Sequence, residues 1–140
     1  MSEKLFLIIK QFICSILDSF GFIRLTAEGT KFYQNLNNND KKNFVEQMRI
    51  QISKSIPVDN SRLICLNQFF EYDESEKSDL LFITFRISPS NEHHFNRKDA
   101  KDVFNDFDKL LSINDFTTSL DIYNYTKYID KRYGFKKTCK

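Results

Sequence analysis

Tryptophan is absent from the sequence, and glycine, proline and histidine are scarce, with three, two and two residues among 140. The low glycine and proline content excludes a collagen-like chain and is not typical of a disordered linker. The three cysteines, Cys14, Cys65 and Cys139, form no C-x-x-C pair, so the spacing of a zinc knuckle or a dithiol redox site is missing. Their odd number argues against a disulfide framework.

A long hydrophobic run is also missing, because Lys10 and Gln11 interrupt the apolar segment of residues 5–17. Neither a membrane-spanning helix nor a secretory signal peptide is expected from such a segment. At helical spacing its apolar residues form one stripe, which predicts an amphipathic packing helix within residues 1–21. An interfacial helix or a poor signal anchor, with membrane association of the chain, is the alternative interpretation.

The chain is instead rich in phenylalanine, with 15 residues and a hydrophobic content of 41%. This composition and the chain length predict one domain with a largely aromatic core. The net charge of +2 is unevenly distributed, because the residues from Lys127 onward carry +5 and residues 1–126 carry −3. We expect a solvated basic tail over residues 129–140, with contact to a phosphate or an anionic surface as the alternative.

Residues 22–29 are rich in β-forming side chains and end at a glycine, which predicts a first strand. An irregular connector is predicted over residues 30–39. Apolar residues then recur at helical spacing behind capping asparagines, which predicts a helix over residues 39–55. Pro57 prevents its continuation.

Residues 62–70 and 79–87 read as two antiparallel strands joined by a charged hairpin over residues 71–78. The second strand alternates apolar side chains on one face, as expected of a sheet with that face buried. A second amphipathic helix is predicted over residues 100–111. The imperfect alternation of residues 119–128 predicts a closing strand.

The predicted order of strand, helix, strand, strand, helix, strand is that of the ferredoxin-like arrangement. The expected fold class is therefore α+β, with a four-stranded antiparallel sheet and two helices on one face. The amphipathic helix of residues 1–21 precedes this domain of residues 22–128, and the basic tail of residues 129–140 follows it.

Four stretches carry a family resemblance: residues 25–29, the helical residues Phe44, Met48 and Ile52, the stretch Ile56-Pro57-Val58-Asp59-Asn60-Ser61-Arg62-Leu63, and residues 81–87. Together they resemble a SEA-type domain over residues 22–126. The resemblance implies a non-enzymatic module of extracytoplasmic or membrane-associated proteins, some of which cleave themselves at a Gly-Ser step in the central hairpin. The hairpin of this chain contains no glycine, so self-cleavage is not expected.

Candidate catalytic groups are few. His93 and His94 are adjacent in a polar loop and lack the ligand spacing of a metal site. A pair of Cys65 with His94 is the catalytic alternative, although a cysteine in an apolar strand tends to have a raised pKa and to be inert. We therefore expect no enzyme activity, metal or cofactor.

These observations favour an interaction module that binds a protein partner or serves as a structural domain. Its candidate surfaces are the acidic hairpin, an unpaired sheet edge and the outer face of the second central strand. The residues that form the candidate surface are Glu71, Asp73, Glu74, Glu76, Phe82 and Arg86. RNA binding through this sheet face and the basic tail is the alternative function, because RNA-recognition sheets stack bases on aromatic side chains. In the opposing interpretation, Phe82 and Leu80 pack beneath the N-terminal helix.

Overall fold

The computed structural model describes residues 4–5, 19–56, 58–88, 99–113 and 124–137. The regular elements are β1 (Ser19–Arg24), α2 (Ala27–Gln34), α3 (Asn38–Ser55), β2 (Leu63–Asp73), β3 (Ser78–Ile87), α4 (Ala100–Ile113) and β4 (Lys136–Lys137). Two short 3-10 helices, η1 (Asn60–Arg62) and η2 (Tyr125–Tyr128), complete the described part of the chain. No helix in these residues is long and apolar enough to cross a membrane.

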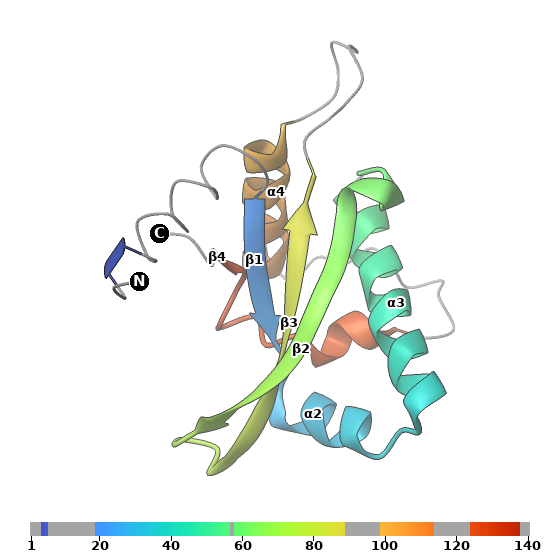
Figure 1. Cartoon of the computed structure of the whole chain (residues 1–140), viewed down its shortest axis with the longest axis vertical. Helices are drawn as coiled ribbons and strands as arrows, with labels where there is room; N and C mark the ends of the chain where they lie inside the picture. The colour runs from blue at the N-terminus through green and yellow to red at the C-terminus, as the bar shows by residue number, and fades with distance from the viewer. Residues whose placement is uncertain (1–3, 6–18, 57, 89–98, 114–123, 138–140) are drawn as a thin grey trace.

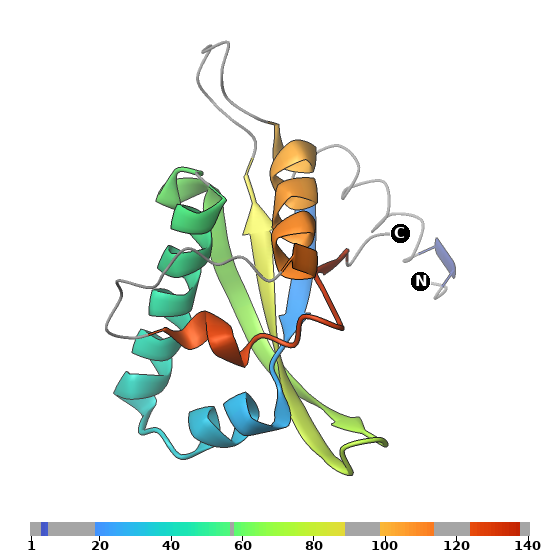
Figure 2. The ribbon, with the colours of Figure 1, turned by 180° about the vertical axis from the view of Figure 1, so that it is seen from behind.

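The strands form one antiparallel sheet in the order β2-β3-β1-β4, shown from its open face in Figure 1. Strands β2 and β3 make a long hairpin, and β1 pairs with the other side of β3. Helices α3 and α4 lie on one face of the sheet with η2 between them, as Figure 2 shows from behind. None of the described helices covers the face that is turned forward in Figure 1.

The main core lies between the sheet and the helices. Strand β3 contributes alternate residues that are fully buried, and the matching side chains of the helices recur at helical spacing. The largest fully buried side chains of this core are Phe44 from α3, Phe85 from β3 and Phe107 from α4. Phe135 reaches the same core from the C-terminal segment, with its ring centroid 4.3 Å from that of Phe107. Gly21 makes room for Phe135, because a Cβ there would lie 2.6 Å from the ring.

The two central strands of the prediction are confirmed, and so are the helices on either side of them. Strands β2 and β3 pair antiparallel, although both extend further into the hairpin than expected. Helix α3 begins one residue before the expected start and ends at Ser55, and the side chain of Asn37 caps it by accepting a hydrogen bond from the Asp40 N–H. The predicted N-terminal helix falls mostly on residues 6–18, outside the described part, whereas Ser19 and Phe20 already belong to β1.

The expected fold class is wrong in its details, although the chain is α+β. The sheet has three long strands rather than four, with only the two-residue β4 added at its edge. Among the described residues, three α-helices accompany the sheet rather than two, because residues 27–34 form α2. Of the segment expected to form the fourth long strand, the described residues 125–128 form η2 instead.

Helix α2 replaces the end of the predicted first strand and the first half of the predicted connector. Thr26 starts the helix, since its hydroxyl accepts a hydrogen bond from the Gly29 N–H at 3.0 Å. A Cβ at Gly29 would lie 2.5 Å from the Cβ of Tyr128, so this glycine allows close packing of α2 on η2. Contacts with a distant segment thus decide the conformation of a stretch whose local composition favours a strand.

The predicted closing strand over residues 119–128 is also wrong where the structure describes it. Residues 125–128 form η2, and Tyr125 packs against Phe44 of α3 with ring centroids 4.6 Å apart. The following residues, expected to be a solvated tail, instead return to the sheet. Ile129 and Phe135 are 2% and 4% exposed, and Lys136 pairs with Phe22 in β4.

A hydroxyl of α2 satisfies a buried backbone donor of the central strand. Thr30 is 2% exposed, and its Oγ1 accepts a hydrogen bond from the Leu81 N–H at 3.0 Å. The isosteric Thr30→Val change leaves this N–H without its acceptor, so we expect the free energy of unfolding to fall by about 1–3 kcal/mol in urea titrations. Thr30→Ser keeps the hydroxyl and serves as the control, with a smaller loss. Equal stability of the valine variant and the unmodified chain would contradict this role.

Candidate interaction surfaces

The open face of the sheet carries a compact aromatic cluster. We define this sheet-face cluster as Phe22 of β1, Phe69 of β2, Phe82 of β3 and Tyr133 of the C-terminal segment. The rings of Phe69 and Phe82 are stacked with centroids 5.1 Å apart, and Phe22 meets Phe82 edge to face at 5.8 Å. Tyr133 closes over Phe82 at 5.5 Å. Phe82 is therefore only 5% exposed, even though no described helix lies on this face.

Arg24 lies at the edge of the sheet-face cluster and connects the segments around it. The guanidinium of Arg24 donates to Oδ2 of Asp130 at 2.7 Å and to Oδ1 of Asp73 at 3.4 Å, and it lies 4.6 Å from the ring centre of Tyr133. These contacts join β1, the end of β2 and the C-terminal segment. The positive charge of Arg24 is thus already neutralised by two carboxylates, which leaves it poorly suited to bind a phosphate.

Within the acidic hairpin, Asp73 has a structural role. Its Oδ2 accepts hydrogen bonds from the Ser75 hydroxyl at 2.6 Å and from the Glu76 N–H at 2.9 Å. The Ser75 bond, followed by the Glu76 bond and the charge of Arg24, holds the pKa of the Asp73 carboxyl below its usual range. Asp73 therefore shapes the turn, whereas the side chains of Glu71, Glu74 and Glu76 are exposed.

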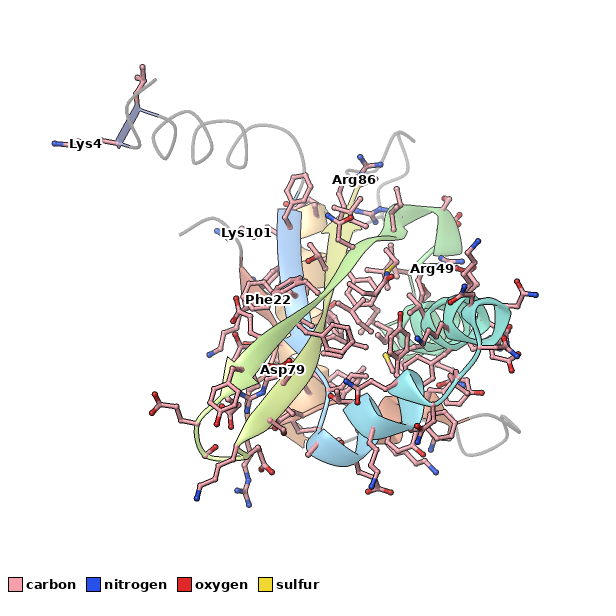
Figure 3. All side chains as sticks on the ribbon, turned by 60° about the horizontal axis from the view of Figure 1, so that its bottom comes forward. Lys4, Phe22, Arg49, Asp79, Arg86 and Lys101 are labelled. Atoms are coloured by element: carbon pink, nitrogen blue, oxygen red, sulfur yellow. The ribbon has the colours of Figure 1, made fainter. Side chains whose placement is uncertain are left out.

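The structure does not gather the predicted surface residues into one site. The acidic side chains lie at the hairpin end of the sheet, where β2 ends and β3 begins, and Phe82 belongs to the sheet-face cluster. Figure 3 labels Asp79 at the start of β3. Arg86 lies toward the other end of β3, where it is paired in register with Phe20 and Ile64. The predicted placement of Phe82 and Arg86 on one face of β3 is consistent with the observed alternation of burial.

A groove lies between the outer edge of β2 and helix α3. It consists of two adjoining hollows of about 450 and 330 Å³ that share Glu46 and Cys65 in their walls. We call both together the edge groove. The residues that line it are Tyr33, Asn38, Lys41, Lys42, Val45, Glu46, Arg49, Ser61, Leu63, Ile64, Cys65 and Gln68.

The edge groove narrows at one end because α3 is tied to the start of β2. Nη1 of Arg49 donates to the Leu63 carbonyl at 3.1 Å, and Nε of Arg49 donates to Glu46 at 3.0 Å. Figure 3 shows Arg49 in the space between these two elements. Toward α2 the strand and the helix diverge in Figures 1 and 2, and the larger hollow opens there.

Strand β2 is an edge of the sheet in the described part of the chain, since its only neighbour there is β3. Its exposed apolar side chains are Leu66, Phe70 and Tyr72, at 38%, 45% and 63% exposure. The pairing with β3 is irregular between Cys65 and Gln68, which places a bulge in the middle of the strand. The edge is therefore regular only on either side of this bulge.

Burial raises the pKa of the Cys65 thiol, which keeps it in the neutral form. Its Sγ accepts a hydrogen bond from the Gln68 amide at 3.3 Å. The described residues contain no group of three or more acidic, cysteine or histidine side chains able to hold a metal ion. His93 and His94, and with them the alternative pairing of Cys65 with His94, lie outside the described part of the chain.

An unpaired sheet edge was expected from the sequence, and Cys65 was considered there only as a catalytic residue, but the edge groove itself was not predicted. The groove depends on the strand order and on the divergence of α3 from β2, neither of which is visible in a linear pattern. The apolar Phe70 and Tyr72 next to the charged hairpin, both exposed in the structure, were the one available indication.

Comparisons of this chain with protein-family models, with curated proteins and with solved structures gave no match in any of the three.

The position of Cys65 in the edge groove can be tested by alkylation. In a Cys14→Ser and Cys139→Ser background, Cys65 is the remaining thiol of the chain. Because its pKa is raised by burial, we expect its reaction with iodoacetamide at pH 8 to be about tenfold slower than that of the same chain in urea. Equal rates in the two states would show that the thiol is neither shielded nor shifted in pKa.

The packing role of Phe82 separates the two interpretations of the open face. Phe82→Ala removes a ring that is 5% exposed, and we expect a loss of about 3–5 kcal/mol in the free energy of unfolding. Phe70→Ala, at a position that is 45% exposed on the neighbouring strand, is the matched control, with a loss below about 1 kcal/mol. If Phe82→Ala were as mild as the control, the ring would be free for base stacking.

Proposed function

We propose that this chain is a non-enzymatic interaction module that binds a protein partner by adding an extended segment of that partner to the edge of β2. The observation that carries the proposal is the coincidence of an open strand edge with the edge groove beside it. An edge strand presents backbone N–H and C=O groups to any chain that can run alongside it. Main-chain pairing supplies affinity in such complexes, and neighbouring pockets supply specificity.

The dimensions of the site support one strand as the occupant. Neighbouring strands lie about 4.8 Å apart, so an added segment would fill the space directly beside β2. Its side chains would alternate between the open face and the wall formed by α3. The larger hollow, at about 450 Å³, lies within the usual range of ligand pockets, about 300–1,000 Å³.

The exposed side chains of the edge support the same function. Phe70 stands beside Tyr33 of α2, with ring centroids 6.5 Å apart, and is still 45% exposed. Tyr72 is 63% exposed on the same strand. Aromatic side chains of this kind are enriched at protein interfaces, where a partner completes their burial.

RNA binding, the alternative function, receives less support from the open face. Phe82 is enclosed by three other rings, and Arg24 at the rim is paired with Asp73 and Asp130. Base stacking needs an accessible aromatic face, and phosphate binding needs a cation that is not already neutralised. The resemblance to SEA-type domains also favours a binding role over a catalytic one.

The proposal can be tested by filling the edge groove. Peptides of about ten residues would be selected from a random library against the full chain, and the tightest one titrated by fluorescence polarisation. The exposed side chain of Gln68 lines the larger hollow. Gln68→Trp places an indole there, and we expect it to weaken peptide binding about tenfold or more.

Asn105→Trp, an exposed position on α4, is the matched control and should bind the peptide normally. Both variants should keep the circular dichroism spectrum of the unmodified chain. Amide shifts of a ¹⁵N-labelled sample locate the bound peptide, and we expect the largest changes in β2 and α3. Peptides that shift the sheet-face cluster instead, and that ignore Gln68→Trp, would overturn the proposal.

A further inference from the structure

We propose that the edge groove selects a partner strand with an apolar residue and an acidic residue two positions apart, the acidic side chain lying between Lys41 and Lys42. This inference rests on the proposed function, because it names the partner chemistry for the same site. It follows from the bulge in β2, the distribution of charge in the groove and the apolar floor beside the two lysines.

The bulge fixes where a regular strand can pair. Two residues of β2, Leu66 and Asn67, lie outside the regular pairing with β3, and a bulge disrupts the ladder on its own strand. The regular edge beyond it runs from Gln68 to Asp73. This part of the edge borders the larger hollow, whose wall on the helix side includes both lysines.

The charge of the edge groove is positive. Its lining has three cations, Lys41, Lys42 and Arg49, and one anion, Glu46. Glu46 forms an ion pair with Arg49 one turn along the helix, and the hydrogen bond from Arg49 lowers the pKa of the Glu46 carboxyl. These two charges therefore cancel, and the net charge of the lining comes from the lysine pair.

Neither lysine has a carboxylate partner among the residues that the structure describes. Glu46, the one carboxylate in the lining of the groove, pairs with Arg49 instead. Lys41 instead places its Nζ 5.4 Å from the ring centre of Tyr33. An acidic side chain from a partner would supply the missing counter-charge at a partly enclosed position, where such a pair is stronger than on an open surface.

The floor next to the lysines is apolar. Val45 is 7% exposed and Tyr33 is 9% exposed, and both line the larger hollow. In an added strand, residues i and i+2 point to the same side, which here is the side of α3. One of them can bury an apolar side chain on this floor while the other reaches the lysine pair.

Three synthetic peptides of about seven residues, blocked at both ends, test this inference. In each peptide every odd-numbered position is threonine. The three even-numbered positions are, in order, valine, a variable residue X and valine, where X is Glu, Gln or Lys. We expect the glutamate peptide to bind tightest and the lysine peptide about tenfold more weakly. Raising the salt concentration should reduce this difference, because screening weakens the ion pairs.

The double variant Lys41→Glu, Lys42→Glu should reverse the order of the glutamate and lysine peptides and leave the glutamine peptide nearly unchanged. Lys101→Glu with Lys109→Glu makes the same charge change on α4, where both lysines are exposed, and should keep the original order. Lys101 lies away from α3 in Figure 3.

The possible failures are distinguishable. If all three peptides bind with equal affinity and shift the amides of β2, the strand-binding function stands and the acidic preference is overturned. If none binds at a concentration of about 1 mM and no amide shifts, both are overturned. If sedimentation shows a dimer that is lost in Gln68→Trp, the occupant is a second copy of the chain, which also overturns the acidic partner.

Discussion

Strand β3 lies between β1 and β2 and buries side chains on both of its faces. On one face Leu81, Ile83 and Phe85 meet the helices, and on the other Phe82 lies within the sheet-face cluster. A strand that is apolar on both sides requires cover on both sides, since exposed apolar area is costly. The helices provide one cover, and Tyr133 contributes to the other.

Because both faces of β3 are covered, the surfaces that stay open in the described part of the chain lie at the periphery of the sheet. The centre of each face is occupied, and β1 is flanked by β3 and β4. The outer edge of β2 has no such neighbour, and α3 stands apart from it over the larger hollow. The hydrogen bond from Arg49 to Leu63 connects α3 to the start of β2. The narrow end of the groove is therefore already formed in the unbound chain. A preformed site loses less conformational entropy on binding than a site that must first become ordered.

The elements with a strong local pattern could be predicted from the sequence. Helix α3 has a clear period and a proline beyond its end, and β3 is a continuous run rich in apolar, β-forming residues. The failures occur where distant contacts decide the structure. Residues 27–34 become a helix because Gly29 admits the distant Tyr128, in addition to the local cap by Thr26, and residues 125–128 turn away from the sheet to pack on α3.

The candidate site was predictable only in part for a similar reason. The face of β3 that bears Phe82 follows from alternation, but whether Phe82 is free depends on Phe69 and Tyr133, which lie far from it in the sequence. In the sequence alone, Lys41 and Lys42 look like part of an ordinary solvated helix face. Only the strand order shows that the open edge of β2 lies opposite them. The pattern of residues within one helix or strand does not show which other element lies beside it.

The bulge at Leu66 and Asn67 has a consequence for solubility as well. A long flat edge can pair with the edges of other copies without limit and grow into fibrils. Here the break in β2 leaves only the short regular stretch from Gln68 to Asp73, which includes the exposed carboxylate of Glu71. Copies of the chain paired along this stretch would bring like charges together, so the same edge can stay open to a foreign strand while resisting uncontrolled polymerisation.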